Sequence, residues 1–513
     1  MKKAITFSLF IIAFTFVLNA QIPNYSEHVA PIIYDNCSSC HHDGGIGEFP
    51  LMSYGSALLR DISIAYNVSK GRMPPWPVDD IEGGFVHDRS LSAEEIKTIV
   101  DWVTEGSPEG DPSLAPSPPV FTSEYVLGEP DLQLKAPVYT SQADHYDDYV
   151  CFTIPTGLTV NKFVKAIEVI PGNPEIVHHC LIYIELKDDP NKFATDVTSH
   201  KCGGPSNKIL LGEYIPGSDP IVYPNDEIIK FGIELEVGAK LILAMHYPHH
   251  SIGSVDSTKI NLHFYPDTVL DVRRVYADAY LEYTGFCIEP NIIDTITIAR
   301  AAGISATVSI MSFFPHMHLI GKEIRAWAIT PDNQYIDLGV ISDWDFEWQG
   351  FYVYRKLKVV PVGSILYGQA IYDNTTNIAN PGEPPVQVCE GGNTDDEMFT
   401  IYAQYLVYEP GDENIDLNAI LDPEGANTVT SVNVSKLNIS PNPVSTGKPS
   451  SITVPDAGVY KLRVFGIQGG VVVDEIITVA NGQYQMNNNL SPGVYLVTLR
   501  GDSHQYVGKL VVQ

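Results

Sequence analysis

Hydrophobic residues between about positions 120 and 410 gather into short runs that Gly, Pro, Asn and Asp interrupt. KLILAMHYP, TVSIMSFFPHMHLIG and MFTIYAQYLVY are examples of these runs. Apolar runs of this length, with turn residues between them, are typical of β-strands. The region is long enough for two β-sandwiches. We predict two all-β, jelly-roll-like domains, over residues 120–267 and 268–412.

The pattern before residue 120 is helical instead. In LSAEEIKTIVDWVTEG, Ser92 stands at an N-cap position and Glu95 at the matching capping-box position. Leu91 and Ile96 are spaced as a hydrophobic staple. The stretch predicts a helix within a small all-α domain over residues 21–107.

Two stretches lack any periodic apolar pattern. The first is PEGDPSLAPSPP, at 108–119, and the second is a polar, irregular run at 413–433. We interpret both as linkers. The remaining residues, 434–513, return to short strands with Gly turns and predict a small β-sandwich.

The first 20 residues have the pattern of a signal peptide. Lys2 and Lys3 precede an apolar run that ends near Leu18, and Ala20 is a small residue at the expected cleavage point. The alternative, a membrane anchor, needs ~20 apolar residues. We therefore predict export, and no later stretch is long and apolar enough for a transmembrane anchor.

Composition and net charge argue against some classes of binding partner. The chain has 513 residues, which predicts several domains, and its net charge is −31. No basic patch stands out, which argues against nucleic acid or an anionic membrane surface as a partner. Seven cysteines in an exported chain favour disulfides, although their odd number leaves at least one cysteine for another use.

The motif CSSCH places two residues between Cys37 and Cys40, and His41 directly after them. Two such thiols add to the vinyl groups of haem, and the histidine ligates the iron. Zinc and a disulfide are the alternatives for a CxxC pair. We predict a covalent haem c in a domain that resembles the c-type cytochromes. Met73 in GRMPPWP is the expected second axial ligand, and Met52 is its competitor.

Three histidines lie on predicted strands of the first β domain. His178 and His179 are neighbours in EIVHHCLIYIE, and His246 is in LILAMHYP. Neighbouring residues on a strand point to opposite faces, so His178 and His179 can share a metal only where the strand ends, twists or bulges. Spacing alone leaves open that these histidines are unrelated.

His316 and His318, in FFPHMHLIG, share a face of a strand, and Met317 points the other way. The pair is half of a transition-metal site. Met398, in NTDDEMFTIYAQYLVY, lies on a later strand. Two histidines and a methionine are a poor zinc site but suit copper, because a soft thioether favours Cu(I).

The order of VHHCLIYIE, LAMHYP, PHMHLIG and DDEMFTIY resembles the copper type II, ascorbate-dependent monooxygenases, the family of peptidylglycine α-hydroxylating and dopamine β-monooxygenases. The resemblance covers roughly residues 120–412, and each predicted β domain holds one ligand set.

The resemblance implies two copper ions, O2 as co-substrate and an external reductant such as ascorbate or a redox protein. It implies one copper that relays electrons and one that binds O2, separated by a solvent-filled cleft. The ligand sets it implies are His178, His179 and His246 for the first, and His316, His318 and Met398 for the second. Tyr402 matches a tyrosine that orients substrate, although a half-buried sheet tyrosine is an equal alternative.

Two positions depart from the peptide-amidating members. Phe314 stands where those members have Arg, and Thr400 stands where they have Asn. Without the Arg a terminal carboxylate loses its bidentate partner. We therefore expect a small-molecule or peptide substrate other than a peptidylglycine.

The resemblance also suggests disulfide pairs. Cys180–Cys202 and Cys287–Cys389 are the pairs expected, with Cys151 left over.

LNISPNPV and the terminal GVYLVTLRGDSHQYVGKLVVQ resemble the C-terminal sorting domain of type IX secretion substrates. A carbohydrate-binding-like accessory domain is the alternative. The resemblance implies the type IX secretion machinery as a partner. It also implies a secreted or outer-membrane surface-attached protein after processing.

The sequence thus predicts an exported dicopper monooxygenase that hydroxylates a C–H bond and carries its own haem. A copper-binding or electron-transfer protein without catalysis is the main rival. A zinc enzyme or hydrolase is the other, and it lacks a convincing carboxylate–histidine set.

Overall fold

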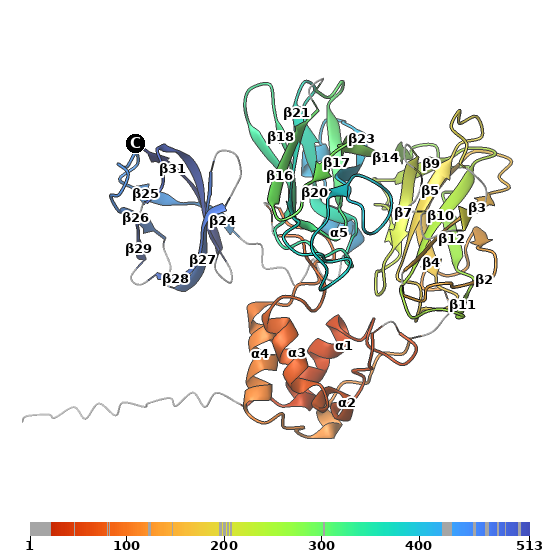
Figure 1. Cartoon of the computed structure of the whole chain (residues 1–513), viewed down its shortest axis with the longest axis horizontal. Coiled ribbons are helices and arrows are strands. Elements are labelled where there is room, and N and C mark those ends of the chain that lie inside the picture. The colour runs from red at the N-terminus through yellow and green to blue at the C-terminus, as the bar shows by residue number, and fades with distance from the viewer. Residues whose placement is uncertain are drawn as a thin grey trace, which may run out of the picture. The chain divides into compact units, whose positions relative to one another are not determined.

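The computed structural model divides the chain into two compact units, Met1–Ile415 and Asp416–Gln513 (Figure 1). It describes residues 22–513 except 46, 80, 82, 122–124, 146, 194–196, 199–201, 203–204, 206–207, 301–302, 423–432, 455–457, 467–470, 480–481, 488 and 501–503. The predicted signal peptide lies outside the described residues.

The described residues are mostly β-strand, with five short α-helices. Four helices lie near the N-terminus and follow a π-helical turn: η1 (Tyr25–Val29), α1 (Ala30–Asn36), α2 (Tyr54–Leu58), α3 (Asp61–Ser69) and α4 (Ala93–Thr104). They share a core that includes Ile33, Ile99 and Trp102. Four helices this short do not by themselves define a cytochrome c domain.

The predicted helix around residue 95 is confirmed as α4. Ser92 Oγ accepts a hydrogen bond from the Glu95 N–H at 3.2 Å, and Glu95 Oε2 accepts one from the Ser92 N–H at 2.8 Å. This reciprocal capping box satisfies two N–H groups at a helix end that would otherwise lack partners.

The first β-sandwich pairs two main sheets. The strands of one are β1 (Leu132–Lys135), β4 (Lys162–Ile170), β8 (Ile221–Val222), β9 (Phe231–Leu235), β12 (Lys259–Phe264) and β13 (Arg273–Arg274). The strands of the other are β3 (Asp148–Pro155), β5 (His179–Glu185), β6 (Val197–Thr198), β7 (Ile209–Tyr214) and β10 (Lys240–Tyr247). Their orders are β1-β12-β4-β9-β13, with β8 beside β4, and β6-β3-β10-β5-β7, while β2 (Tyr139–Thr140) pairs with β11 (Val255–Asp256).

The second β-sandwich also has two main sheets. One contains β14 (Tyr276–Glu282), β17 (Val308–His316), β20 (Tyr352–Val360) and β23 (Thr400–Val407), and the other contains β16 (Ile293–Ala299), β18 (Gly321–Ile329), β19 (Tyr335–Ile341) and β21 (Ile365–Asp373). Their orders are β14-β23-β17-β20 and β16-β21-β18-β19. Because β13 still pairs with β9, the first sandwich extends to Arg274, beyond the predicted boundary at 267.

Burial along β10 shows where the two sandwiches meet. Every residue from Leu241 to Tyr247 is buried. Since successive side chains of a strand point to opposite faces, both faces of β10 must be covered. One face packs inside its own sandwich, and Ile242 and Ala244 on the other face form a core cluster with Phe314 of β17. The histidines described below lie at this contact.

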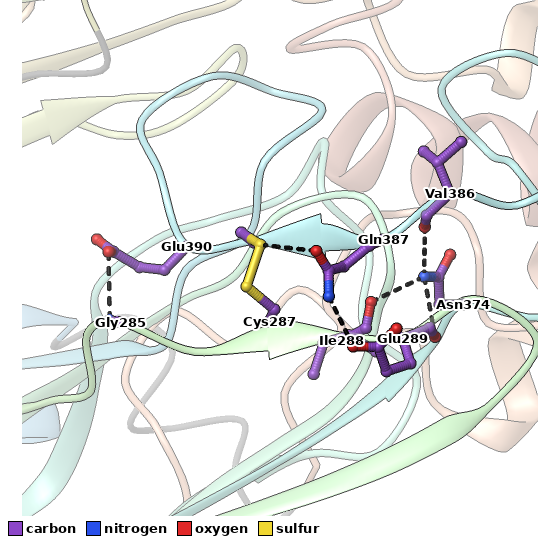
Figure 2. The surroundings of a disulfide bond; sticks show 9 residues. Gly285, Cys287, Ile288, Glu289, Asn374, Val386, Gln387 and Glu390 are labelled. Carbon is purple, nitrogen blue, oxygen red and sulfur yellow. Dashed lines mark hydrogen bonds between the residues drawn. A yellow bond between two sulfur atoms is a disulfide. The ribbon is translucent and has the colours of Figure 1, made fainter.

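The expected disulfide between Cys287 and Cys389 is confirmed. It joins β15 (Cys287–Ile288) to β22 (Val388–Cys389), and Figure 2 shows its surroundings. Beside it the Asn374 side-chain amide donates to the carbonyl oxygens of Ile288 and Val386, at 3.2 and 2.8 Å. The bridge and the amide together fix the segment that leads to Met398.

The expected disulfide Cys180–Cys202 is wrong, because Cys202 bonds to Cys151 and Cys180 is a free, buried thiol. The cause is the pleat of the sheet. Cys180 follows His179 on β5, so its side chain points to the opposite face, into the sandwich. Cys151 pairs with Ala244 across β3 and β10 and therefore lies on the face that carries His179.

The described residues between 76 and 86 leave the helical region and pack on the second sandwich. Trp76 and Phe85 join its hydrophobic core. The Val86 N–H donates to the Val353 carbonyl oxygen at 2.7 Å, and Phe85 forms a β-bridge with Tyr354. This segment therefore adds a short strand-like edge beside β20, although the predicted helical domain includes it.

The second unit is a small β-sandwich with its own core, which includes Leu462, Val497 and Leu510. After α5 (Leu417–Leu421), one sheet contains β24 (Asn433–Lys436), β27 (Gly458–Gly466), β28 (Val471–Val479), β30 (Gly493–Arg500) and β31 (His504–Val512), and the other contains β25 (Asn438–Ser440), β26 (Ser450–Thr453) and β29 (Gln483–Met486).

Candidate metal centre

The three histidines of the first sandwich converge where β5 begins. His179 is the first residue of β5, and His178 lies just before the strand. The pairing register sets His179 opposite His246 of β10, and the His178 N–H donates to the His246 carbonyl oxygen at 3.0 Å. His178 is therefore free of the strand's alternation, which resolves how two neighbouring histidines can face one point.

The Nδ1 atoms form the point of convergence. His179 Nδ1 lies 3.3 Å from His178 Nδ1 and 3.2 Å from His246 Nδ1, and one ring nitrogen from each histidine lies within 4.8 Å of the others. An imidazole nitrogen without a proton is a good ligand for copper, zinc, iron or nickel. The donor set therefore fits a transition metal. We name His178, His179 and His246 the three-histidine set.

Carboxylates occupy the far side of two of these rings. His178 Nε2 lies 2.6 Å from Glu347 Oε2, and His246 Nε2 lies 2.9 Å from Asp147 Oδ2. When each Nε2–H donates to its carboxylate, Nδ1 carries the lone pair that a metal needs. Both far-side partners thus select the tautomer in which the Nδ1 atoms can bind metal together.

Burial favours the neutral form of two of these rings, His179 and His246. It lowers the pKa of His179 well below the ordinary 6.5, and the neighbouring His246 and His178 lower it further. Burial also lowers the pKa of His246, although hydrogen bonding to Asp147 acts in the opposite direction. Neutral imidazoles can bind a cation without first losing a proton.

The second set lies at the end of β17. His316 is the last residue of the strand, and His318 follows the intervening Met317. The two histidine rings stand edge to face with their centroids 5.2 Å apart. Met317 is fully buried in the hydrophobic core, as the alternation of a strand predicts. The histidines and not Met317 face the other sandwich.

Neutral groups hold these two rings. His316 Nδ1 lies 2.5 Å from Gln349 Oε1, and His318 Nδ1 lies 3.2 Å from the Asp396 carbonyl oxygen. If each Nδ1–H donates, both Nε2 atoms are left for a metal. Burial lowers the pKa of His316 to about 3 and that of His318 to about 4, so both rings are neutral at ordinary pH.

A buried carboxyl group joins Met398 to this site. Glu397 Oε1 accepts hydrogen bonds from the backbone N–H of His318 and from that of Met398, the second at 2.8 Å. Since His316 pairs with Thr400, continuing the antiparallel register brings Met398 beside His318. Burial raises the pKa of Glu397 to about 8, so it is uncharged at neutral pH. We name His316, His318 and Met398 the histidine–methionine set.

The two sets face each other across a narrow gap. His179, His316 and His318 line one cavity of about 40 Å³. A hydrogen bond of 2.8 Å from Thr394 Oγ1 to the Tyr149 hydroxyl closes one side of the gap. The two sandwiches therefore approach closely at these histidines, and the solvent-filled cleft that the resemblance implies stays a prediction.

A larger cavity of about 840 Å³ opens beside the histidine–methionine set. His316, Met398, Phe314 and Tyr402 line it, as do residues of the first sandwich. Tyr402 packs on Phe314 with ring centroids 5.6 Å apart, and burial raises its pKa to about 12. Thr400 is buried and does not line this cavity.

The CSSCH motif lies between α1 and α2. Cys37 and Cys40 are free thiols, and His41 Nδ1 lies 2.9 Å from the Phe49 carbonyl oxygen. The donor set fits a covalent haem, because this bond leaves His41 Nε2 available for iron. The structure does not bring the Met73 side chain, which is 38% exposed, into the helical core.

Sequence reasoning missed Asp147, Glu347, Gln349 and Glu397. Only Glu397 had a signal, since it directly precedes Met398 in the chain. The other three belong to loops whose contacts with the histidines depend on tertiary folding.

Two adjoining β-sandwiches with converging histidines define a β-protein with a candidate metal centre. Residues 281–422 match the family model of the copper type II ascorbate-dependent monooxygenase, C-terminal domain, and residues 438–513 match the secretion system C-terminal sorting domain. Residues 281–422 are therefore similar to one domain of that family, and the sorting domain implies that the chain is exported, to be secreted or attached to the cell surface. The first match contains the histidine–methionine set, and the three-histidine set lies outside it.

No curated protein matches the chain. Among solved structures, a biofilm associated protein BSP domain is 9% identical, covering 74% of this chain and 81% of that one with a TM-score of 0.14. The FN1–FN3 domains of chicken CNTN1 are 9% identical, covering 71% and 99% with a TM-score of 0.13. Scores this low carry no inference. Among the described residues, no helix combines the length and apolarity that crossing a membrane requires.

Proposed function

We propose that this protein is a dicopper monooxygenase that hydroxylates a C–H bond and receives electrons through its own c-type haem. The observation that carries the proposal is the cavity that His179 shares with His316 and His318. A mononuclear zinc site would require only one such set. Two ligand sets that face each other suit a reaction needing electron delivery at one place and oxygen chemistry at another.

The histidine–methionine set is the proposed oxygen site. Copper bound at the two sets would supply one-electron transfer and activation of O2. A thioether beside two neutral imidazoles favours Cu(I), the state that reacts with O2. The overall reaction is R–H + O2 + 2 e⁻ + 2 H⁺ → R–OH + H2O.

The cavity of about 840 Å³ is the proposed substrate site, since it opens directly beside His316 and Met398. Phe314 and Tyr402 would contact the substrate and orient the bond to be hydroxylated. Because Phe314 offers no charge, it gives a terminal carboxylate no bidentate partner at this position. A peptidylglycine is therefore disfavoured as the substrate.

The three-histidine set is the proposed electron relay. Glu347 and Asp147 fix two of its rings, and burial lowers the pKa of His179 and of His246. Fixed ligands change little in position when a metal gains or loses an electron, which favours fast transfer.

Contacts between the CSSCH motif and the first sandwich support the haem as electron donor. Cys40 Sγ lies so close to Gly217 that a Cβ at this glycine would collide with the sulfur. The Arg89 guanidinium donates to the Gly217 carbonyl oxygen at 2.8 Å. Cys37 and Cys40 would hold the haem, with His41 and Met73 as its proposed axial ligands. One of these residues, Cys40, therefore contacts the first sandwich.

The same contact leads toward the three-histidine set. Gly217 follows β7, whose last residue, Tyr214, pairs with Cys180 of β5. Cys180 is the residue after His179. A haem held by Cys37, Cys40 and His41 would supply one-electron transfer to copper held by the three-histidine set. An external one-electron donor of the ascorbate or redox-protein class would restore the haem.

Metal analysis tests the assignment first. We expect two coppers and one haem per chain, whereas zinc in both sets would overturn it. O2 consumption by the copper-loaded protein with a panel of oxidisable small molecules and peptides then separates an oxygenase from a copper protein without catalysis.

Stopped-flow reoxidation of the haem tests the electron route. After stoichiometric reduction under O2, haem reoxidation should be faster with copper than without it. Identical rates would refute electron transfer from the haem to copper. Gly217→Ala should slow the copper-dependent phase by pushing Cys40 away. Gly253→Ala is the matched control, because both glycines have positive φ, +72° and +79°, but no atom lies within 4 Å of the space beside Gly253.

A further inference from the structure

One loop of the second sandwich contacts both ligand sets. It comprises residues 342–351, between β19 and β20, and we name it the 342–351 loop. It lies far from every histidine of the two sets in sequence, and none of the candidate ligands belongs to it.

The loop supports the histidine–methionine set through three side chains. Gln349 Oε1 lies 2.5 Å from His316 Nδ1, and the Gln349 amide nitrogen donates to the Phe346 carbonyl oxygen at 2.7 Å. The Trp344 indole N–H donates to the His318 carbonyl oxygen at 3.1 Å. The Phe346 ring stands edge-on to the His318 ring, with centroids 5.9 Å apart.

The same loop crosses to the first sandwich at two places. Glu347 Oε2 lies 2.6 Å from His178 Nε2. The Phe351 N–H donates to Glu213 Oε1 of β7 at 2.5 Å. His178 therefore receives its fixing carboxylate from the other sandwich, whereas Asp147 serves His246 from within its own.

We propose that the 342–351 loop couples the two copper sites, with Glu347 as a positioning residue for His178 and Gln349 as the matching residue for His316. The inference rests on the proposed function, because it concerns the metals of that same pair of sites. Glu347 and Gln349 are only two residues apart, so the loop cannot shift at one histidine without shifting at the other.

Two physical consequences follow. Groups that hold the far nitrogen of a metal-bound histidine change metal affinity by roughly 10–100-fold. A loop shared by two sites also links their affinities, and linkage is reciprocal. Metal at the histidine–methionine set, by fixing His316 and thus Gln349, holds Glu347 against His178 and strengthens copper binding at the three-histidine set.

The first experiment titrates copper into full-length protein carrying Glu347→Gln, which removes the charge but keeps the shape. We expect a roughly 10-fold or greater loss of copper affinity at the three-histidine set and a changed Cu(II) EPR signal. Glu347→Asp should recover part of both. Asp343→Asn is the matched control, since Asp343 is an exposed carboxylate of the same loop that makes no hydrogen bond or ion pair with His178 or His316 in the described part of the chain.

The second experiment measures the coupling. His318→Ala, which disables the histidine–methionine set, should weaken copper binding at the three-histidine set by roughly 5-fold or more. In the Glu347→Gln background the same change should have no further effect. Direct repulsion between two copper ions would instead make His318→Ala strengthen binding, and it would persist without Glu347; that result would overturn the coupling.

The outcomes distinguish a failure of the proposed function from a failure of the coupling through the loop. Wild-type protein that binds no copper would refute the proposed function. Wild-type protein that binds two coppers, with Glu347→Gln indistinguishable from Asp343→Asn in affinity and EPR signal, would refute the shared loop alone.

Discussion

The two ligand sets face each other, yet they are built differently. Charged carboxylates hold the far nitrogens of the three-histidine set, from Asp147 and Glu347. Neutral groups hold the histidine–methionine set: the Gln349 amide and the Asp396 carbonyl oxygen. A carboxylate raises the basicity of its imidazole, whereas an amide does so less.

This difference suits a division of labour. More basic imidazoles stabilise Cu(II), so the three-histidine set can accept and hold a relay metal through both oxidation states. Less basic imidazoles and a thioether favour Cu(I). In the proposed function the histidine–methionine set is therefore the place where O2 would react, and its neutral partners would avoid a fixed negative charge beside reduced oxygen.

The largest expected effect is loss of the thioether. Met398→Ala should abolish hydroxylation because the oxygen site loses its soft ligand, while the three-histidine set keeps its copper. O2 consumption and copper content per chain measure the two results. The haem spectrum should be unchanged, and retained hydroxylation in this variant would contradict the assignment of Met398.

The next effect concerns Glu397, which supports the histidine–methionine set without being one of its ligands. Glu397→Ala removes the acceptor shared by the His318 and Met398 backbone N–H groups, leaving two buried donors unsatisfied. We expect the free energy of unfolding to fall by about 3 kcal/mol. Chemical denaturation with and without copper measures it.

Glu397→Gln is the matched variant for that experiment. Because Glu397 is uncharged at neutral pH, a glutamine oxygen should accept the same two bonds and preserve most of the stability. Equal destabilisation by Ala and Gln would show that the carboxyl group has another role.

A smaller effect is expected from the carboxylate at the three-histidine set. Asp147→Asn should weaken copper binding there by roughly 10–100-fold, because His246 loses its charged partner. Copper titration measures the change. Asp144→Asn is the control on the same loop, where the carboxylate is 62% exposed and contacts only His145 in the described residues; an equal loss in that variant would remove the special role of Asp147.

The smallest effect concerns Glu213 of the first sandwich, which accepts a hydrogen bond from Phe351 of the second. Burial raises the pKa of Glu213 from 4.5 to about 8, so the folded protein retains a proton that the unfolded chain releases. Stability from this group is therefore greatest below the unfolded pKa and falls as pH rises toward 8. We expect Glu213→Gln to flatten that fall, by up to about 1.4 kcal/mol for each pH unit between the two pKa values, measured by unfolding at several pH values. An unchanged slope would contradict a protonated Glu213.

Much of the local structure could be predicted from sequence. Ser92 and Glu95 predict the start of α4 because a capping box acts within one turn. The i, i+2 spacing of His316 and His318 predicts a shared face because strand geometry is local. The Cys287–Cys389 bridge came from family resemblance instead, since spacing does not determine disulfide pairing.

The failures share a different cause. The pairing of Cys202 with Cys151 depends on which face of β3 and β5 each side chain occupies, and on where a distant loop folds over that face. Trp76 and Phe85 read as part of the helical region, but their apolar surface is buried on the second sandwich. Burial against a distant element leaves no periodic signal in either segment.

The sequence by itself determined which residues can ligate metal and on which local elements they stand, because imidazole and thioether chemistry and strand alternation need only near neighbours. Tertiary structure alone decided which nitrogen of each histidine is available, because Asp147, Glu347 and Gln349 reach their rings across 33 to 169 positions of chain. It also decided how closely the two sets approach. Long-range packing fixes both, since hydrogen bonds to a far nitrogen and the width of a cavity depend on elements that the chain brings together only when folded.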